Sequence, residues 1–251
     1  MTYPTTPSYL YTFSVPTPFP VGPVNLYLAE GEPLTLLDAG PRYDPARKAL
    51  TEALAERGYR VADLQRLILT HAHPDHCGLA AELVRESGAE VMAHAETDLI
   101  CLYQPQRRLL LSGDHLLRDI SSNPLVEPPA PGQTERPRRL VEYMAQLRRV
   151  AEMDIALTLP GHGPPITDHR ALIRERLAFH EKRARHILET MGDEALTTHE
   201  IVSQLFSGLD PINHFLAISE VIGHLQWLEV EGRVTRREQG GVARWRGKTR
   251  Y

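Results

Sequence analysis

The chain has 251 residues, of which 42% are hydrophobic and 24% charged, and its formal net charge is −4. This composition is that of an ordinary globular protein, and the slight acidic excess argues against a polyanion-binding surface over the whole molecule. No apolar run reaches the roughly 20 residues of a membrane span, and the first residues lack the basic and apolar regions of a signal peptide. With only two cysteines, Cys77 and Cys101, we expect reduced thiols and a cytoplasmic protein that does not contact a membrane.

Residues 8–58 predict strands followed by a helix. Apolar runs at 25–29 and 34–37 are separated by the turn composition Glu-Gly-Glu-Pro, which indicates two neighbouring strands. The second run ends in Asp38-Ala39-Gly40. Asp44-Pro45 predicts a helix that runs to Gly58, with the Asp as N-cap and the Pro at the first helical position.

A short apolar run at 67–69 predicts a buried strand, and four side chains that can bind metals follow it. Imidazole nitrogens and carboxylate oxygens are ligands that zinc, iron and manganese accept. Side chains two residues apart point the same way in extended backbone, and the turn that follows can aim the later pair at an adjacent position. A histidine-rich surface loop is the alternative, but four ligands in six residues favour one loop that serves two metal ions. These residues are His71, His73, Asp75 and His76.

The chain then alternates between helices and strands, which predicts an α/β layered core. A helix at 77–86 leads to a strand at 91–93 that ends at His94, which we expect to pack rather than to bind metal. After another strand at 109–111, a Pro-rich segment at 121–138 predicts a loop, and an amphipathic helix follows at 140–153.

Two more strands end in polar motifs. The strand at 109–111 ends in Gly113-Asp114, and the strand at 155–159 ends in Pro160-Gly161-His162-Gly163, where glycines let the backbone bring the imidazole close. Because ligands of α/β folds gather where strands end, we expect Asp38, the loop at 71–76, Asp114 and His162 to lie at one edge of the core.

These motifs together resemble the signature of the metallo-β-lactamase superfamily. The resemblance implies an α/β fold, the αββα metallo-β-lactamase sandwich, and two divalent metal ions, with zinc first and iron or manganese as alternatives. In such a site the Asp of Gly113-Asp114 bridges both ions, and Asp38 lies beneath the metal loop. Asp38 would then accept the second ring N–H of a ligating histidine, whereas satisfying its own turn backbone is an equal alternative. The implied ligands are His71, His73, Asp75, His76, Asp114 and His162.

One part of the family pattern is missing. Members of the superfamily place a further histidine, the third protein ligand of the first metal, before the Gly-Asp strand, but no histidine lies between His94 and His115. We therefore predict that a segment with this ligand and a substrate-covering lid is absent, which would weaken the first metal site. An intact mass of 28.3 kDa would identify a true deletion, and a larger mass would identify omitted residues.

The C-terminal part predicts a separate module. A long helix at 168–191, two shorter helices, and a hairpin around Glu238-Gln239-Gly240-Gly241 resemble the winged-helix-like module of lactamase-like endoribonucleases. We expect a hydrolase domain at 1–167, a connecting helix at 168–192 and this module at 193–251. Its hairpin and tail are basic, so nucleic-acid binding is one use of the module, although residues 193–231 carry no Lys or Arg; homodimerisation is another.

The expected chemistry is hydrolysis. Two metal ions about 3.5–4 Å apart can share a hydroxide, because metal binding lowers the pKa of water. The resemblance favours a metal-dependent, glyoxalase II-like hydrolase whose metal-activated hydroxide attacks a small-molecule thioester or ester, with Asp75 orienting the nucleophile and moving its proton. A phosphodiesterase or endoribonuclease acting on RNA, and a weakened metal- or nucleic-acid-binding protein, remain as alternatives. The ligand types also allow non-haem iron chemistry.

Overall fold

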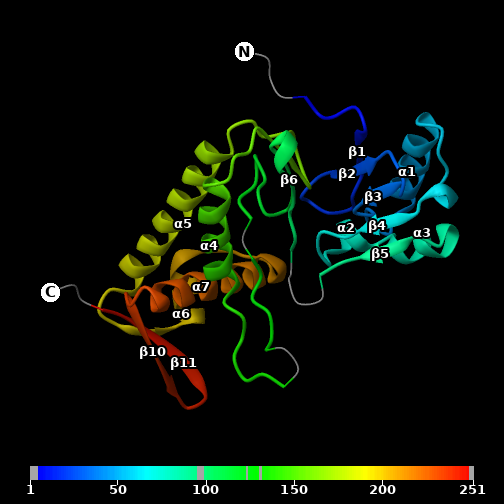
Figure 1. Ribbon diagram of the computed structural model, residues 1–251. Coiled ribbons are helices and arrows are strands. Elements are labelled where there is room, and N and C mark those ends of the chain that lie inside the picture. The colour runs from blue at the N-terminus through cyan, green and yellow to red at the C-terminus, as the bar shows by residue number, and fades with distance from the viewer. Residues whose placement is uncertain (1–4, 95–98, 123, 130–131, 249–251) are drawn as a thin grey trace. The chain divides into compact units, whose positions relative to one another are not determined.

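The computed structural model describes residues 5–94, 99–122, 124–129 and 132–248 (Figure 1). The chain forms two compact units. The N-terminal unit consists of residues 1–122 and 154–169, and the C-terminal unit consists of residues 123–153 and 170–251. This division separates the parts of the chain that are compact by themselves, and it places residues 123–153 with the C-terminal unit. It does not test the predicted domain limits at 167 and 192, which stay a prediction. Within the described residues, no helix combines the length and the apolar character that a membrane crossing requires.

The N-terminal unit contains two β-sheets. The larger sheet has the strand order β1-β2-β3-β4-β5, and in it β3 and β4, and β4 and β5, pair in parallel. In the smaller sheet, β7 lies between β6 and a parallel β8. The strands are β1 (Leu10–Val15), β2 (Val24–Ala29), β3 (Thr35–Leu37), β4 (Arg66–Ile68), β5 (Glu90–Met92), β6 (Leu102–Gln104), β7 (Leu109–Gly113) and β8 (Leu157–Pro160).

The alternation of side chains along β2 explains the layers of this unit. Leu26 and Leu28 belong to a buried cluster that contains Leu50 of the helix α1, whereas Tyr27 belongs to a second cluster that contains Leu159 of the smaller sheet. Successive residues of a strand face opposite sides, so one sheet can contact helices on one face and another sheet on the other. The resulting order of helix, sheet and sheet agrees with the α/β sandwich fold inferred from the sequence. The helices of this unit are α1 (Asp44–Glu56), α2 (Pro74–Cys77) and α3 (Ala80–Ser87).

Two local predictions for this unit are wrong. The N-cap of α1 is Tyr43, and Asp44 lies in the first turn, where its charge is favourable at the positive end of the helix dipole. The helix predicted at 77–86 is present as α3 but begins only at Ala80, because Cys77 ends α2 and the Leu79 N–H donates to the carbonyl of Gly40 (3.0 Å). Gly78 allows this close approach, since a Cβ there would collide with the backbone of Arg42 and Pro74.

The C-terminal unit combines helices with a small sheet of order β10-β11-β9. The predicted hairpin is present as β10 and β11. The sheet has a third strand, β9, which the sequence did not predict because it has only three residues. Thr197 caps α6: its hydroxyl accepts from the Glu200 N–H (3.2 Å), and the Glu200 carboxylate accepts from the Thr197 N–H (2.7 Å). The likeness of this unit to a winged-helix module stays a prediction. Its elements are α4 (Arg139–Ala151), α5 (His169–Met191), β9 (Ala195–Thr197), α6 (Thr198–Leu205), α7 (Pro211–Val230), β10 (Val234–Gln239) and β11 (Val242–Gly247).

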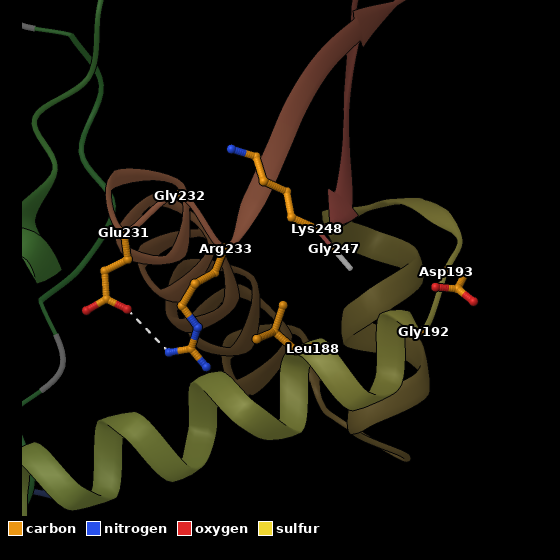
Figure 2. A pocket seen from close by; sticks show the side chains of 8 residues that line it. All are labelled: Leu188, Gly192, Asp193, Glu231, Gly232, Arg233, Gly247 and Lys248. Atoms are coloured by element: carbon orange, nitrogen blue, oxygen red, sulfur yellow. Dashed lines mark hydrogen bonds and ion pairs between the residues drawn. The ribbon is translucent and has the colours of Figure 1, made fainter. Parts of the chain in front are cut away.

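A pocket of about 490 Å³ lies within the C-terminal unit (Figure 2). The guanidinium of Arg233, which lines it, is 3.0 Å from a Glu181 carboxylate oxygen and 3.3 Å from one of Glu231, so its charge is already compensated. The pocket contains none of the predicted metal ligands. Its lining residues are Leu188, Gly192, Asp193, Glu231, Gly232, Arg233, Gly247 and Lys248.

Candidate metal centre

The predicted ligands follow the ends of four strands in the N-terminal unit. Asp38 follows β3, the loop at 71–76 follows β4, Asp114 follows β7 and His162 follows β8. Pro74 occupies the first turn of the short helix α2, which turns the chain after His73 and brings the next two ligands inward.

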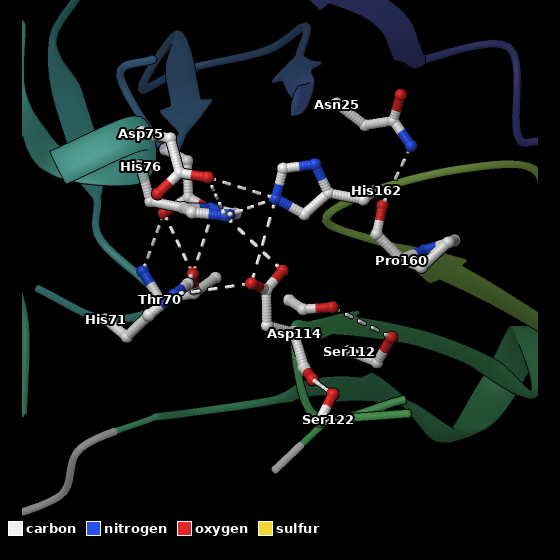
Figure 3. A network of polar contacts seen from close by, with 12 residues as sticks. Asn25, Thr70, His71, Asp75, His76, Ser112, Asp114, Ser122, Pro160 and His162 are labelled. Carbon is white, nitrogen blue, oxygen red and sulfur yellow. Dashed lines mark hydrogen bonds and ion pairs between the residues drawn. The ribbon is translucent and has the colours of Figure 1, made fainter. Parts of the chain in front are cut away.

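The structure brings all six predicted ligands into two neighbouring groups. Figure 3 shows the side chains of His71, Asp75, His76, Asp114 and His162 converging. One group offers ligand atoms from His71, His73 and Asp114, and the other from Asp75, His76 and His162; within each group these atoms lie within 4.8 Å of one another. The second group is fully buried, whereas His73 is exposed.

The carboxylate of Asp114 lies between the two groups. Its Oδ1 is 3.3 Å from His76 Nε2, and its Oδ2 is 3.6 Å from His71 Nε2 and 3.7 Å from His162 Nε2. Gly161 makes room for this arrangement, because a Cβ at this position would collide with Asp114 Oδ1 and lie 2.8 Å from His76 Cε1. A carboxylate between two ligand groups has the position that a bridging ligand requires.

Hydrogen bonds at Nδ1 determine which ring nitrogen each buried histidine presents to the centre. His162 Nδ1 donates to the Pro23 carbonyl (2.8 Å), and His76 Nδ1 donates to Asp38 Oδ2 (2.9 Å). The Thr70 hydroxyl donates to the Asp38 carboxylate, so its oxygen accepts from His71 Nδ1 (2.9 Å). In a neutral imidazole the other nitrogen then carries a lone pair, so all three rings present Nε2 as a metal ligand.

The buried ligand atoms have the properties of a metal site. His71 Nε2 and Asp114 Oδ1 are buried without a hydrogen-bond partner, which is costly unless another group binds them. His76 Nε2 and His162 Nε2 lie only 3.2 Å apart, a contact that requires a proton or a metal ion between the two nitrogens. A metal ion bound here would take the place of the proton and give the orphaned atoms a partner, so the residues match a divalent metal ion.

The electrostatics of the centre favour neutral histidines beside ionised carboxylates, with one exception. Burial lowers the pKa of His71 to about 4, which keeps its ring neutral. Burial raises the pKa of Asp75, but the nearby His162 and the charge of His76 outweigh this effect and lower the pKa to about 2. Burial also disfavours a charge on His76, yet the carboxylates of Asp114 and Asp38 raise its pKa to about 10. The metal-free centre therefore attracts one positive charge, which a metal ion would supply.

The carboxylate of Asp38 contacts both ends of the metal-binding loop, at Thr70 and His76. Besides His76, its carboxylate accepts hydrogen bonds from the Thr70 N–H (2.8 Å) and the Thr70 hydroxyl (2.8 Å). It is buried and has a positive φ of 60°, a strained conformation that the surrounding contacts must maintain. The sequence left two roles open for Asp38, support of a ligating histidine and satisfaction of its own turn backbone. These contacts agree with the support of a ligating histidine, His76.

Sequence reasoning missed the residues that hold the His162 loop. The Asn25 side-chain amide donates to the carbonyls of Pro160 (3.0 Å) and Gly163 (2.7 Å), and the Tyr27 hydroxyl donates to the Pro160 carbonyl (2.6 Å). A polar Asn inside an otherwise apolar strand was the available signal. His115, which follows Asp114 in the sequence, is buried, and burial lowers its pKa to about 4.

Comparison with known proteins identifies the family. Residues 19–100 match the model of the metallo-β-lactamase superfamily, and residues 184–248 match the model of the metallo-β-lactamase-like C-terminal domain. A probable metallo-hydrolase of Bacillus subtilis, YqjP, is 30% identical over 94% of this chain and 95% of its own length. The chain belongs to the metallo-β-lactamase superfamily. It is a metallo-hydrolase, with His and Asp groups suited to divalent metals.

Two further comparisons describe the fold and a relative with a named activity. A metallo-β-lactamase family protein of Thermus thermophilus matches 96% of this chain and 99% of its own, with 25% identity and a TM-score of 0.81. An atrochrysone carboxyl ACP thioesterase of Pseudocercospora fijiensis is 21% identical over 89% of this chain and 74% of its own length. The alignment with YqjP covers 312 positions, more than the 251 residues of this chain, so YqjP contains segments without a counterpart here.

Proposed function

We propose that this metallo-hydrolase cleaves a small-molecule thioester or ester. The observation that carries the proposal is the set of groups in direct polar contact with the side chains of the predicted ligands. Among the described residues, every side-chain hydrogen bond or ion pair of a ligand joins it to another ligand, to Asp38, to Thr70 or to the Pro23 carbonyl. No Arg or Lys takes part. Phosphodiesters carry a charge that cationic side chains usually bind, whereas a carbonyl group does not need one.

The named activity of one relative also supports a thioester. The Pseudocercospora fijiensis relative is called an ACP thioesterase. Thioesters and esters share the acyl carbonyl as the reacting group, so both fall within the proposed substrate class.

The roles of the residues follow from the centre. We assign the metal ions to His71, His73, Asp75, His76, Asp114 and His162, with zinc first because His and Asp ligands are typical of catalytic zinc sites. When bound, the ions supply Lewis acidity, which polarises a carbonyl oxygen and lowers the pKa of water. Because its pKa is about 2, Asp75 stays ionised and can accept a hydrogen bond from the attacking water and orient it.

A substrate panel with and without chelator tests the proposal. We expect hydrolysis of an acyl thioester, an aryl ester or a lactone that chelator abolishes, and no cleavage of single-stranded RNA. Asp75→Asn should lower kcat at least about 100-fold, whereas the matched change Asp154→Asn, at an exposed position, should not. Cleavage of RNA without turnover of any acyl substrate would contradict the proposal.

A second candidate, action on RNA, is favoured by the outer face of the C-terminal hairpin. Val234 and Trp245 are buried, so strand alternation places the next residues of β10 and β11 on the opposite, solvent-facing side. There Arg237 lies directly opposite Arg244, and Arg246 follows two residues along the strand. Like charges in a directly opposed pair repel each other, so a bound phosphate backbone would stabilise this face. Arg244 is partly compensated by Glu200 (3.3 Å).

Binding of single-stranded RNA tests this candidate. The double variant Arg237→Gln/Arg246→Gln should lower RNA affinity and reduce the salt slope by about one per lost phosphate contact. The double variant Arg42→Gln/Arg60→Gln, which removes two exposed arginines of the N-terminal unit, serves as the charge-matched control. Dimerisation is the competing use of this module, and sedimentation at several protein concentrations would detect it.

A further inference from the structure

The two ligand groups of the metal centre differ in how firmly the protein holds them. In the group of Asp75, His76 and His162, all three residues are buried, with relative exposures of 8%, 0% and 3%. Both histidines have their Nδ1 hydrogen-bonded to an acceptor that is itself fixed, the Asp38 carboxylate and the Pro23 carbonyl. Their Nε2 atoms are therefore oriented before a metal binds.

The distances within this buried group already match one metal ion. Ligand atoms about 2.0–2.1 Å from a tetrahedral zinc ion lie roughly 3.3–3.4 Å from one another. His162 Nε2 is 3.2 Å from Asp75 Oδ2 and 3.2 Å from His76 Nε2, and His76 Nε2 is 3.3 Å from Asp114 Oδ1. The edges His162 Nε2–Asp114 Oδ2 and His76 Nε2–Asp75 Oδ2 are longer, at 3.7 and 3.9 Å. The ligand atoms of Asp75, His76, Asp114 and His162 thus lie 3.2–3.9 Å apart in these pairs, close to the spacing around one zinc ion, and Asp114 approaches the two histidines with different oxygens.

The other group is less complete. His73 is exposed, and within the described residues its ring has no hydrogen bond that would fix its orientation. His71 is oriented by Thr70, but Asp114 Oδ2, 3.6 Å from its Nε2, is shared with His162 of the buried group. The sequence supplies no histidine between His94 and His115 that could complete this group.

We propose that the two metal positions are strongly unequal. One ion binds tightly at Asp75, His76, Asp114 and His162, and a second ion binds weakly and exchangeably at His71, His73 and the shared Asp114. Loss of one orienting contact typically costs 10–100-fold in metal affinity, so a position that lacks both a ligand and an orienting contact should be weaker by at least roughly 100-fold. The inference rests on the proposed metal centre and applies to any of the acyl substrates considered above.

Titration of the metal-free protein with Zn²⁺ or Co²⁺ in the presence of a competing chelator tests the inference. We expect one tight equivalent and a second equivalent at least roughly 100-fold weaker. His73→Ala changes an exposed residue and should therefore preserve the fold; it should remove the weak step and leave the tight one unchanged. His162→Ala should remove the tight step, and His199→Ala, at an exposed position of the C-terminal unit, should affect neither.

The possible outcomes separate this inference from the proposed function. Two equivalents of equal affinity, or a weaker tight step in His73→Ala, would overturn the inequality and leave the hydrolase proposal intact. Absence of any metal binding to the folded protein, as judged by circular dichroism, would overturn the metal centre itself. Because the readout is binding stoichiometry and affinity, the test does not depend on knowing the substrate.

Discussion

Replacement of Asp38 by Asn tests whether this buried carboxylate orients a metal ligand. The carboxylate accepts hydrogen bonds from His76 Nδ1 (2.9 Å), the Thr70 N–H (2.8 Å) and the Thr70 hydroxyl (2.8 Å). Asn has the same shape and tolerates the positive φ of 60° at this position, so the backbone should not change. The amide oxygen can still accept from the Thr70 N–H, but the amide nitrogen then faces His76 and can only donate.

The substitution therefore affects metal binding by His76 Nε2. When a metal ion takes the place of the proton on Nε2, the atom that faces Asp75, Asp114 and His162, the remaining proton of His76 must stay on Nδ1. In the variant this Nδ1–H faces the amide N–H instead of a carboxylate, so metal binding loses one charge-assisted hydrogen bond. Such a bond is worth about 1.5–3 kcal/mol, which corresponds to a loss of affinity of roughly 10–100-fold.

Competition with a chromophoric chelator would measure this loss, and thermal unfolding with circular dichroism would show that the variant is folded. Nitrogen chemical shifts of His76 would report the tautomer directly. Asp154→Asn, at an exposed carboxylate, is the matched control and should bind metal like the unchanged protein. Unchanged affinity in Asp38→Asn would refute the reasoning that this carboxylate directs His76.

Three further predictions concern packing, metal removal and pH. Gly161→Ala should weaken metal binding at least about tenfold, because the added Cβ collides with the carboxylate of Asp114 and the imidazole of His76. The control Gly22→Ala, with open space at its Cβ, should keep full affinity despite some backbone strain. Competition with a chelator compares the two variants. Metal at 100 times its Kd should stabilise the folded protein by about 2.7 kcal/mol, so chelator should lower the midpoint of thermal unfolding; an unchanged midpoint would contradict binding to the folded state. Burial lowers the pKa of His180 from 6.5 to about 3 and that of His224 from 6.5 to about 4. The unfolded chain therefore binds protons that the folded one does not, and stability should be full above pH 6.5 and fall toward pH 4. Urea unfolding across this range should show how stability depends on pH. The double variant His180→Leu/His224→Leu should reduce this dependence, to which His71 and His115 also contribute, and the exposed-site change His199→Leu should leave it unchanged.

The sequence by itself determined the family, the α/β class and the set of candidate ligands. Metal-binding residue types at fixed short spacing, such as His71 and His73, are a local property that the chain displays before it folds. The same holds for the glycines around His162 and for the Gly-Gly turn of the C-terminal hairpin, because turns and tight approaches depend on residues close in sequence.

Only the tertiary structure decided how the ligands are oriented. The Nδ1 partners of His76 and His162 are Asp38 and the Pro23 carbonyl, which lie 38 and 139 residues away in the sequence. The support of the His162 loop by Asn25 and Tyr27 likewise joins strands of two different sheets. Periodicity and spacing describe neighbours along the chain, whereas the direction of a lone pair is set by contacts that exist only after distant segments have packed. The inequality proposed for the two metal positions arises from those long-range contacts.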